Sequence, residues 1–294
     1  MKKHLVFIHG RSQEFKDARA LKGEWVGALV NTLDSLRLKA PISEEDIRFP
    51  YYGQTLYDLV DGAQGAAVAD VILQGVATDT GERDFLIGVA LEMQQALQIK
   101  DEEAREMAGG DVIEQGPQDW KWVRGLLRVI DSRVGGASGA SIAAFTKDVY
   151  QYLRNPGIRD AIEAGVLKAF EPGVPTVVLG HSLGSVVAYN VLKREGVDRG
   201  WKVPLFITVG SPLAVTMIRK SLRPIGRPQC VEQWFNARDP RDVVALYPLD
   251  NDHFGVSPAI ENKNDVVNET PNRHGIAGYL SDPVVVRKIF DALH

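Results

Sequence analysis

Residues 177–184 read Val177-Val178-Leu179-Gly180-His181-Ser182-Leu183-Gly184, which is an apolar run followed by a G-x-S-x-G turn. An apolar pattern with helical spacing continues from Val186 to Leu192. A strand, a tight turn and a helix in this order expose the hydroxyl of Ser182 at the carboxyl edge of a sheet. Gly180 and Gly184 suit such a turn, because side chains at these two positions would collide with the neighbouring strand and helix. The stretch therefore predicts an exposed serine on an α/β fold.

Strand-like runs alternate with helical patterns on both sides of this stretch. The predicted strands are Leu5–Ile8, Asp46–Phe49, Thr176–Leu179, Leu205–Val209 and Val231–Asn236, and the predicted helices are Arg19–Leu38, Leu183–Arg194 and Asp282–Leu293. Strands separated by helices predict a mostly parallel sheet with helices on both faces. Ligands of such sheets bind outside the carboxyl ends of the strands, which is where the candidate site residues fall.

Between residues 58 and 169 this alternation stops and the pattern becomes helical. Helices are predicted at Asp58–Leu73, Arg83–Ala108, Trp120–Asp131 and Ser141–Leu153, and a last one, Asn155–Phe170, precedes the strand that leads to Ser182. We expect an α/β core of residues 1–57 and 170–294, with residues 58–169 as a mostly helical insertion. The insertion is either a packing layer or a cap that selects substrates.

A serine hydroxyl needs a base to act as a nucleophile, and the base needs an acid to fix its tautomer. After a serine in such a turn, the acid comes next along the chain and the histidine follows. Asp239 and Asp242 both follow the last predicted strand. Asp242 is favoured, because two small apolar residues after it allow a partly buried turn. Asp239 precedes Pro240, as turn-forming aspartates do.

Two of the six histidines are candidates for the base. His274 lies in a loop directly ahead of the closing helix, which is the expected position. His253 follows Asp242 closely and has the character of a loop residue. His274 is therefore the preferred base, and His253 is the alternative.

An oxyanion formed at Ser182 needs two backbone N–H donors. The N–H of Leu183 is one, because it lies at the start of a helix, where the helix dipole favours negative charge. The other is expected in the loop after the first strand, where Gly10 lets the backbone come close. Arg11 is the preferred donor there, and Ser12 is the second choice.

Three further residues are expected to contact substrate: Ser12, Tyr52 and His181. Ser12 belongs to the loop after the first strand, and His181 lies inside the turn that carries Ser182. Tyr52 follows the second predicted strand, where packing in the core is an equally good explanation.

Charge and composition restrict the classes of function. The net charge is −4, so no overall basic field attracts nucleic acid. The single cysteine excludes an intrachain disulfide and fits a reducing compartment, and the apolar run Leu5–Ile8 is too short for a secretory signal. No apolar window approaches the roughly 18 residues of a membrane span. We expect a cytoplasmic protein without a transmembrane segment.

The sequence contains no motif typical of metal or nucleotide binding. There is no paired-cysteine or H-E-x-x-H spacing, and no glycine-rich phosphate loop with its lysine. We therefore expect neither a metal ion nor a cofactor.

Together these residues resemble the α/β-hydrolase superfamily. The resemblance is most specific at Gly180–Gly184 and at His9-Gly10, and it covers both parts of the predicted core. The run Arg241-Asp242-Val243-Val244 looks like the acid turn of lipase-type members, which also favours Asp242. The chain is similar to the compact-sheet variants of small lipases and cutinases, with a large helical insertion added.

The resemblance implies a serine hydrolase that cleaves a carboxylic ester, or a related acyl bond, through an acyl-enzyme. Ser182 would attack, His274 would carry the proton and Asp242 would orient the imidazole. The implied partner is a small-molecule ester or acyl substrate, not a nucleic acid. A thioesterase or lipase for long acyl chains is one alternative. A binding module with this fold and no turnover is the other.

Overall fold

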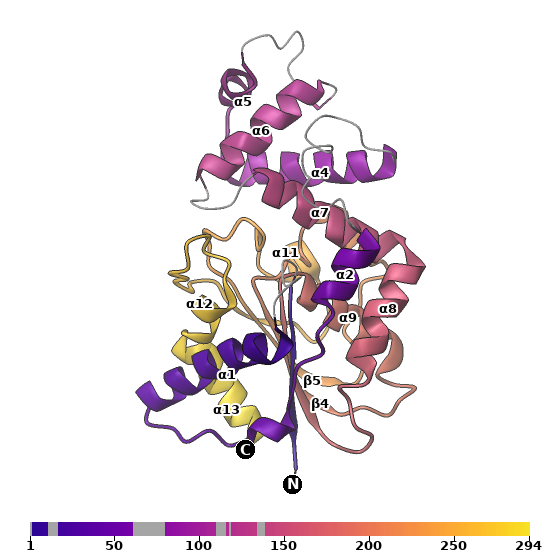
Figure 1. Cartoon of the computed structure of the whole chain (residues 1–294), viewed down its shortest axis with the longest axis vertical. Coiled ribbons are helices and arrows are strands. Elements are labelled where there is room, and N and C mark those ends of the chain that lie inside the picture. Colours follow the sequence, from indigo (N-terminus) through magenta and orange to yellow (C-terminus); the bar gives the residue numbers. More distant parts are fainter. Residues whose placement is uncertain (1, 11–16, 61–79, 110–115, 118, 134–138) are drawn as a thin grey trace.

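The computed structural model describes residues 2–10, 17–60, 80–109, 116–117, 119–133 and 139–294 (Figure 1). Within these residues, the strands β1 (His4–Ile8), β2 (Ile47–Arg48), β3 (Thr176–His181), β4 (Val203–Val209), β5 (Val231–Ala237) and β6 (Glu261–Lys263) form one sheet. Their order is β2-β1-β3-β4-β5-β6, and every neighbouring pair is parallel. The predicted α/β fold with a parallel sheet is confirmed.

Helices cover both faces of the sheet (Figure 1). One face carries α1 (Ala18–Ser35), α12 (Ile276–Leu280) and α13 (Pro283–Leu293), and the other carries α8 (Pro156–Leu167), α9 (Leu183–Glu195) and α10 (Thr216–Ser221). Two short helices, η1 (Glu44–Asp46, a 3-10 turn) and α11 (Asn251–Phe254), lie in connections. Because helices cover both faces, the central strands are completely buried: every residue of β1 and β3 is buried.

Alternation along β1 divides the apolar core into two layers. Val6 and Ile8 pack on the face that carries α8 and α9, whereas Leu5 and Phe7 pack on the face that carries α1 and α13. Side chains of a strand point to opposite faces in turn, so a fully apolar strand supplies both layers.

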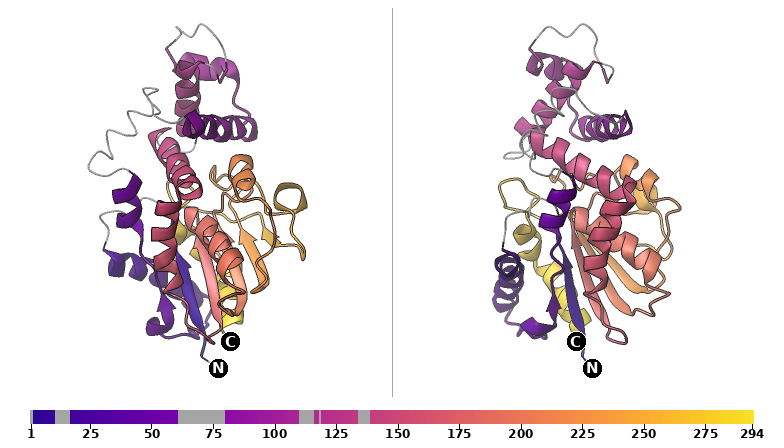
Figure 2. Two further views of the ribbon diagram at one scale, coloured as in Figure 1. Left: turned by 90° about the vertical axis from the view of Figure 1, so that its right-hand side faces the viewer. Right: turned by 45° about the vertical axis from the view of Figure 1, so that its right-hand side comes forward.

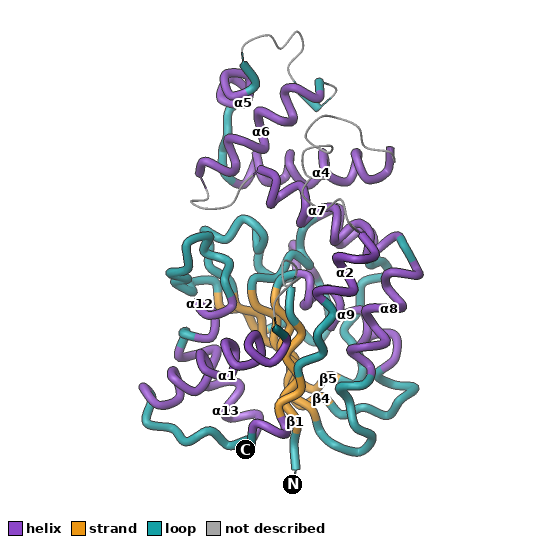
Figure 3. The backbone as a smooth tube through the Cα atoms, viewed as in Figure 1, coloured by secondary structure: helices purple, strands orange, loops and turns teal. Residues whose placement is uncertain are grey.

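The helical insertion lies between β2 and β3, above the carboxyl edge of the sheet (Figures 1 and 2). It follows α2 (Gly53–Val60) and contains α4 (Thr80–Ala96), α5 (Asp101–Met107), α6 (Trp120–Arg133) and α7 (Gly139–Arg154). Its described residues are helices and loops, and the strands all lie below it (Figure 3). The division of the chain into residues 1–57 with 170–294 and residues 58–169 stays a prediction.

A polar contact joins the insertion to the core at α4. The Glu92 carboxylate accepts hydrogen bonds from the Thr216 backbone N–H (2.9 Å) and the Thr216 hydroxyl (2.9 Å) at the start of α10. Beside it, Gly88 lies against Met217, where an added Cβ would come within 2.7 Å of Met217 Cγ. The middle of α4 is therefore packed closely on the core.

A buried polar network forms the second junction, between α7, α8 and α9. Glu163 accepts hydrogen bonds from the Tyr152 hydroxyl (2.8 Å), from Asn190 Nδ2 (2.8 Å) and from Arg194 Nη1 (2.9 Å). Only Asn155 separates α7 from α8, and its side chain caps α8. The insertion thus continues into the helix layer of the core without a flexible connection at this point.

Two of the predicted helices in the insertion differ from the structure. The single helix predicted at Arg83–Ala108 is wrong, because Gln98 adopts a left-handed conformation (φ 53°) that ends α4. The Glu103 carboxylate then accepts the Lys100 N–H at 2.9 Å and starts α5. The helix predicted at Asp58–Leu73 overlaps α2, which begins earlier, and residues 61–73 lie outside the described residues.

The described helices include none that is long and apolar enough to cross a membrane.

Candidate active site

The chain reverses its direction across the sheet at β1. It leaves β1 through α1 toward β2, and it returns to β3 on the other side of β1. Ligands of α/β proteins bind at such a switch point, outside the carboxyl ends of the strands. Gly10, just after β1, and Ser182, just after β3, meet there. A Cβ added to Gly10 would lie 2.8 Å from Ser182 Cβ and 3.2 Å from Ser182 Oγ.

Ser182 has a strained backbone conformation, with φ 56° and ψ −131°. Positive φ is unfavourable for a residue with a side chain, at a cost of about 1–3 kcal/mol. Hydrogen bonds on both sides hold the turn: the Ser182 N–H donates to Val209 O (3.2 Å), and the Ser182 carbonyl accepts from the Ser185 N–H (2.9 Å) and hydroxyl (2.6 Å). These hydrogen bonds hold the Ser182 side chain at the end of β3, where it is buried with 2% of its surface exposed, so the prediction of an exposed serine is wrong.

The two glycines of the turn are required by close backbone packing. A Cβ on Gly184 would overlap the carbonyl oxygen of Ile8 at the end of β1, and a Cβ on Gly180 would lie 2.7 Å from Ser185 Cα. The glycines therefore let α9 begin directly against the two central strands, as the sequence pattern predicts.

Ser182, His274 and Asp242 form a continuous chain of hydrogen bonds. His274 Nε2 lies 2.8 Å from Ser182 Oγ, and His274 Nδ1 lies 2.7 Å from Asp242 Oδ2. The Asp242 side chain is fully buried, and its other oxygen accepts the Val244 N–H at 2.9 Å. Because a carboxylate faces Nδ1, that nitrogen carries the proton and Nε2 presents its lone pair to the serine hydroxyl.

The neighbouring candidate acid, Asp239, is engaged elsewhere. Its carboxylate accepts from Arg241 Nη2 (2.7 Å) and Nε (3.0 Å), and from the Asn268 N–H (2.8 Å). Burial favours a higher pKa for Asp239, but the hydrogen bonds from Arg241 and Asn268 outweigh it, so the pKa lies below its usual value. Asp239 therefore stabilises the turn and does not contact His274.

The alternative histidine, His253, also lies outside this chain of contacts. Its Nδ1 is 2.7 Å from Asp250 Oδ1, and its ring stacks on Tyr247 at a centroid distance of 4.6 Å. Of the alternatives considered from the sequence, the structure brings Asp242 and His274 together with Ser182.

Tyr279, which sequence reasoning missed, contacts the same carboxylate. Its hydroxyl donates to Asp242 Oδ2 at 2.6 Å and accepts the Asp239 N–H at 3.3 Å. Burial and the negative charge of Asp242 raise the pKa of Tyr279 well above its usual value, so the hydroxyl stays protonated and donates. Gly210, with φ 55°, makes room: a Cβ there would lie 3.0 Å from Tyr279 and 3.1 Å from His274.

His181 lies beneath the loop that carries His274. Burial, together with electrostatic repulsion from His274, lowers the pKa of His181 to about 3, so its ring is neutral. Its Nε2–H donates to the backbone carbonyl of His274 at 2.7 Å, and its ring packs edge-on against Trp25. The structure thus places His181 where it holds the His274 loop, with only 8% of its surface exposed for the predicted substrate contact.

Tyr52 is buried against the end of β1. Its hydroxyl donates to the His9 carbonyl, its N–H donates to His9 Nε2 (3.0 Å), and the two rings stack at 4.0 Å. His9 Nδ1–H in turn donates to Gly10 O at 2.7 Å. Of the two explanations for Tyr52, the contacts favour packing: this tyrosine fixes the backbone that leads to Gly10.

The structure describes only one of the residues expected to supply the two oxyanion donors, Leu183. Leu183 is the first residue of α9, where backbone N–H groups have no partner within the helix. Arg11 and Ser12 lie outside the described residues, so the donor after β1 stays a prediction. In the described part of the chain, no group of three or more His, Cys, Asp or Glu side chains could hold a metal ion.

The fold and the strand order define the class of this protein. It is an α/β protein with an all-parallel sheet of six described strands and a helical insertion between β2 and β3. Comparison of the chain with protein-family models, with curated proteins and with solved structures found no match.

Proposed function

We propose that this protein is a serine hydrolase of the α/β-hydrolase type, which cleaves a carboxylic ester or related acyl bond through an acyl-enzyme on Ser182. One observation carries the proposal: a single chain of hydrogen bonds links Ser182 Oγ, both ring nitrogens of His274 and Asp242 Oδ2. A nucleophile, a base within hydrogen-bond reach and a group that orients the base are the parts of acyl-transfer chemistry.

In this mechanism, Ser182 Oγ attacks the acyl carbon while its proton passes to His274 Nε2. The same proton then goes to the leaving alkoxide, and the alcohol departs from an acyl-enzyme. His274 next takes a proton from water, whose oxygen attacks the acyl carbon, and returns it to Ser182 Oγ as the carboxylic acid leaves. Asp242 stabilises the imidazolium that forms twice in each cycle.

We assign the stabilisation of the tetrahedral intermediate to the Leu183 N–H. It directly follows Ser182 at the start of α9, where the helix dipole adds positive potential. One such donor typically contributes ~10²–10³-fold in rate. The second donor is the predicted N–H of Arg11.

Tyr279 and His181 act as positioning residues in this account. The Tyr279 hydroxyl shares Asp242 Oδ2 with His274, so it fixes the carboxylate and draws negative charge away from the imidazole. His181 donates a hydrogen bond to the backbone carbonyl of His274 and so fixes the position of the His274 loop relative to the sheet. Neither residue takes part in bond making or breaking.

Hydrolysis of a series of p-nitrophenyl esters, from acetyl to palmitoyl, tests the proposal. We expect release of nitrophenol by the wild type and a loss of at least ~10⁴-fold in Ser182→Ala, because removal of the nucleophile removes covalent catalysis. A rate that peaks at long chains would identify the lipase or thioesterase alternative. Equal rates in the wild type and Ser182→Ala would contradict the proposal.

A further inference from the structure

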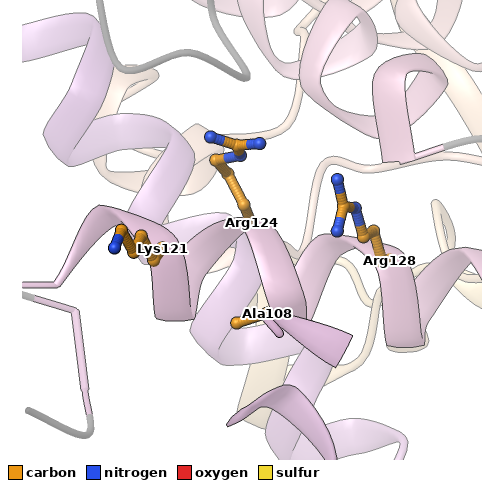
Figure 4. A pocket seen from close by; sticks show the side chains of 4 residues that line it. All are labelled: Ala108, Lys121, Arg124 and Arg128. Atoms are coloured by element: carbon orange, nitrogen blue, oxygen red, sulfur yellow. The ribbon is translucent and has the colours of Figure 1, made fainter. Parts of the chain in front are cut away.

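Among the described residues, three cations and one small residue line a cavity on the helical insertion. The cavity has a volume of about 170 Å³, and these residues are Lys121, Arg124 and Arg128 of α6 with Ala108, which follows α5 (Figure 4). The three basic residues follow one another at helical spacing, so they lie along one face of α6. This concentration of positive charge occurs on a chain whose net charge is −4.

No described carboxylate forms an ion pair with any of these three cations. Glu103, on the neighbouring helix α5, is bound to Arg133 and to the Lys100 N–H. Asp119 accepts the backbone N–H of Lys121 at 2.8 Å, as a helix cap does. Like charges three and four positions apart on a helix repel one another. The cavity therefore holds positive charge that the described chain does not neutralise.

Packing on the opposite face of α6 holds the helix in one orientation and leaves Lys121 and Arg128 exposed. Trp122, Leu126 and Ile130 are completely or almost completely buried there. At Gly125, a Cβ would overlap the carbonyl oxygen of Ala104, so the two helices touch through their backbones. Arg128 Nη1 also donates to Met107 O at 3.1 Å, which fixes one wall of the cavity.

We propose that this cavity binds the phosphate group of a ligand. Guanidinium groups donate two parallel hydrogen bonds to phosphate oxygens, and a lysine adds a point charge. A phosphate dianion offers more acceptors and more charge than a carboxylate, so it matches three cations better. The group belongs either to a soluble phosphorylated molecule or to the headgroup of an anionic lipid.

The phosphate site is separate from the Ser182 site. Helices α5 and α6 form the end of the insertion that is farthest from the sheet (Figures 1 and 2). Ser182 lies at the carboxyl end of β3, within the core. The inference therefore does not depend on the proposed hydrolase activity.

Calorimetric titration of the 294-residue chain with inorganic phosphate tests the site. The variant is Arg124→Gln/Arg128→Gln, and the control is Lys39→Gln/Lys168→Gln, which removes the same charge from exposed positions outside α5 and α6. We expect saturable binding by the wild type and the control, and binding at least ~10-fold weaker in the variant, because charge-assisted contacts are lost. Acetate should bind more weakly than phosphate. Circular dichroism checks that the variant is folded.

Co-sedimentation with vesicles identifies the source of the phosphate. Vesicles of phosphatidylcholine alone are compared with vesicles that also contain phosphatidic acid. If the anionic vesicles capture the wild type and the control but not the variant, the ligand is a lipid headgroup. If the protein binds free phosphate but not the vesicles, the ligand is soluble. Equal behaviour of the variant and the control, equal affinity for acetate and phosphate, or binding to neither probe would overturn the proposal.

Discussion

The Tyr279 hydroxyl donates a 2.6 Å hydrogen bond to Asp242 Oδ2, the oxygen that also faces His274. Two donors therefore share one carboxylate oxygen, and the Tyr279 hydroxyl fixes the carboxylate that orients the His274 ring. This relationship follows from the structure alone, because Tyr279 belongs to a helix and Asp242 to a distant turn.

Tyr279→Phe removes this donor and leaves the ring in place. The Asp242 carboxylate is then held less firmly against His274. We expect kcat/KM to fall by up to ~10-fold, because a hydrogen bond to a charged group contributes ~1.5 kcal/mol. Steady-state kinetics of ester hydrolysis measure this loss. An unchanged kcat/KM in the folded variant would contradict the positioning role of Tyr279.

Asp242→Asn and Asp239→Asn form a matched pair on one turn. Loss of the Asp242 carboxylate leaves His274 without its orienting partner, so kcat should fall by ~10³–10⁴-fold in a folded protein. Loss of the Asp239 carboxylate weakens the contact with Arg241 and should lower the free energy of unfolding by about 1–2 kcal/mol, with activity nearly unchanged. Steady-state kinetics measure kcat, and urea unfolding measures the free energy of unfolding, for each of the two variants. The reverse pattern would make Asp239 the acid.

Gly10→Ala places a methyl group against the serine. Its Cβ would lie 3.2 Å from Ser182 Oγ, so the side chain must shift. A displacement of ~1 Å can cost ~10²-fold in rate, and we expect a loss of at least ~10-fold. Gly23→Ala is the control, because a Cβ at that exposed position of α1 meets nothing within 4 Å and should stabilise the helix by ~0.5–1 kcal/mol. Unchanged activity in Gly10→Ala would contradict the described geometry.

His181 makes the protein sensitive to acid in a defined pH window. Its pKa is about 3 in the folded protein, against 6.5 for an unperturbed histidine, so the unfolded state binds a proton first as the pH falls. The stability from neutral His181 is complete above pH 6.5 and decreases toward pH 3. In His181→Gln, this proton-linked loss is absent.

Urea unfolding of the wild type and His181→Gln at pH 7 and pH 4 measures this effect. The advantage of the wild type should shrink by roughly 3 kcal/mol between the two pH values, on the basis of 1.36 kcal/mol for each pH unit below 6.5. An advantage that does not change with pH would show that His181 is not held neutral.

The local parts of this structure were predictable from the sequence. The strand, turn and helix around Ser182 are encoded within adjacent residues, since the apolar run, the two glycines and the helical spacing all lie between Val177 and Leu192. The five predicted strands and the closing helix are present close to their expected bounds, because each strand contains local apolar residues and the helix carries its own capping residue, Asp282.

Other features depend on contacts between distant segments. The strand β6 has the sequence Glu261-Asn262-Lys263, which contains no apolar residue, and it forms only because the edge of β5 offers hydrogen-bonding partners. The break at Gln98 has no glycine or proline to mark it. Tyr279 and His181 acquire their places through His274 and Asp242, which no local pattern encodes.

Labelling with a fluorophosphonate probe tests the central claim most directly. An activated serine oxygen forms a bond to phosphorus and fluoride leaves, so the modified peptide can be identified by mass spectrometry. We predict labelling of the wild type at Ser182, none in Ser182→Ala, and strongly slowed labelling in His274→Ala, which lacks the base. A folded wild-type protein that the probe does not label at Ser182 would contradict the proposed hydrolase and leave the non-catalytic binding module as the better account.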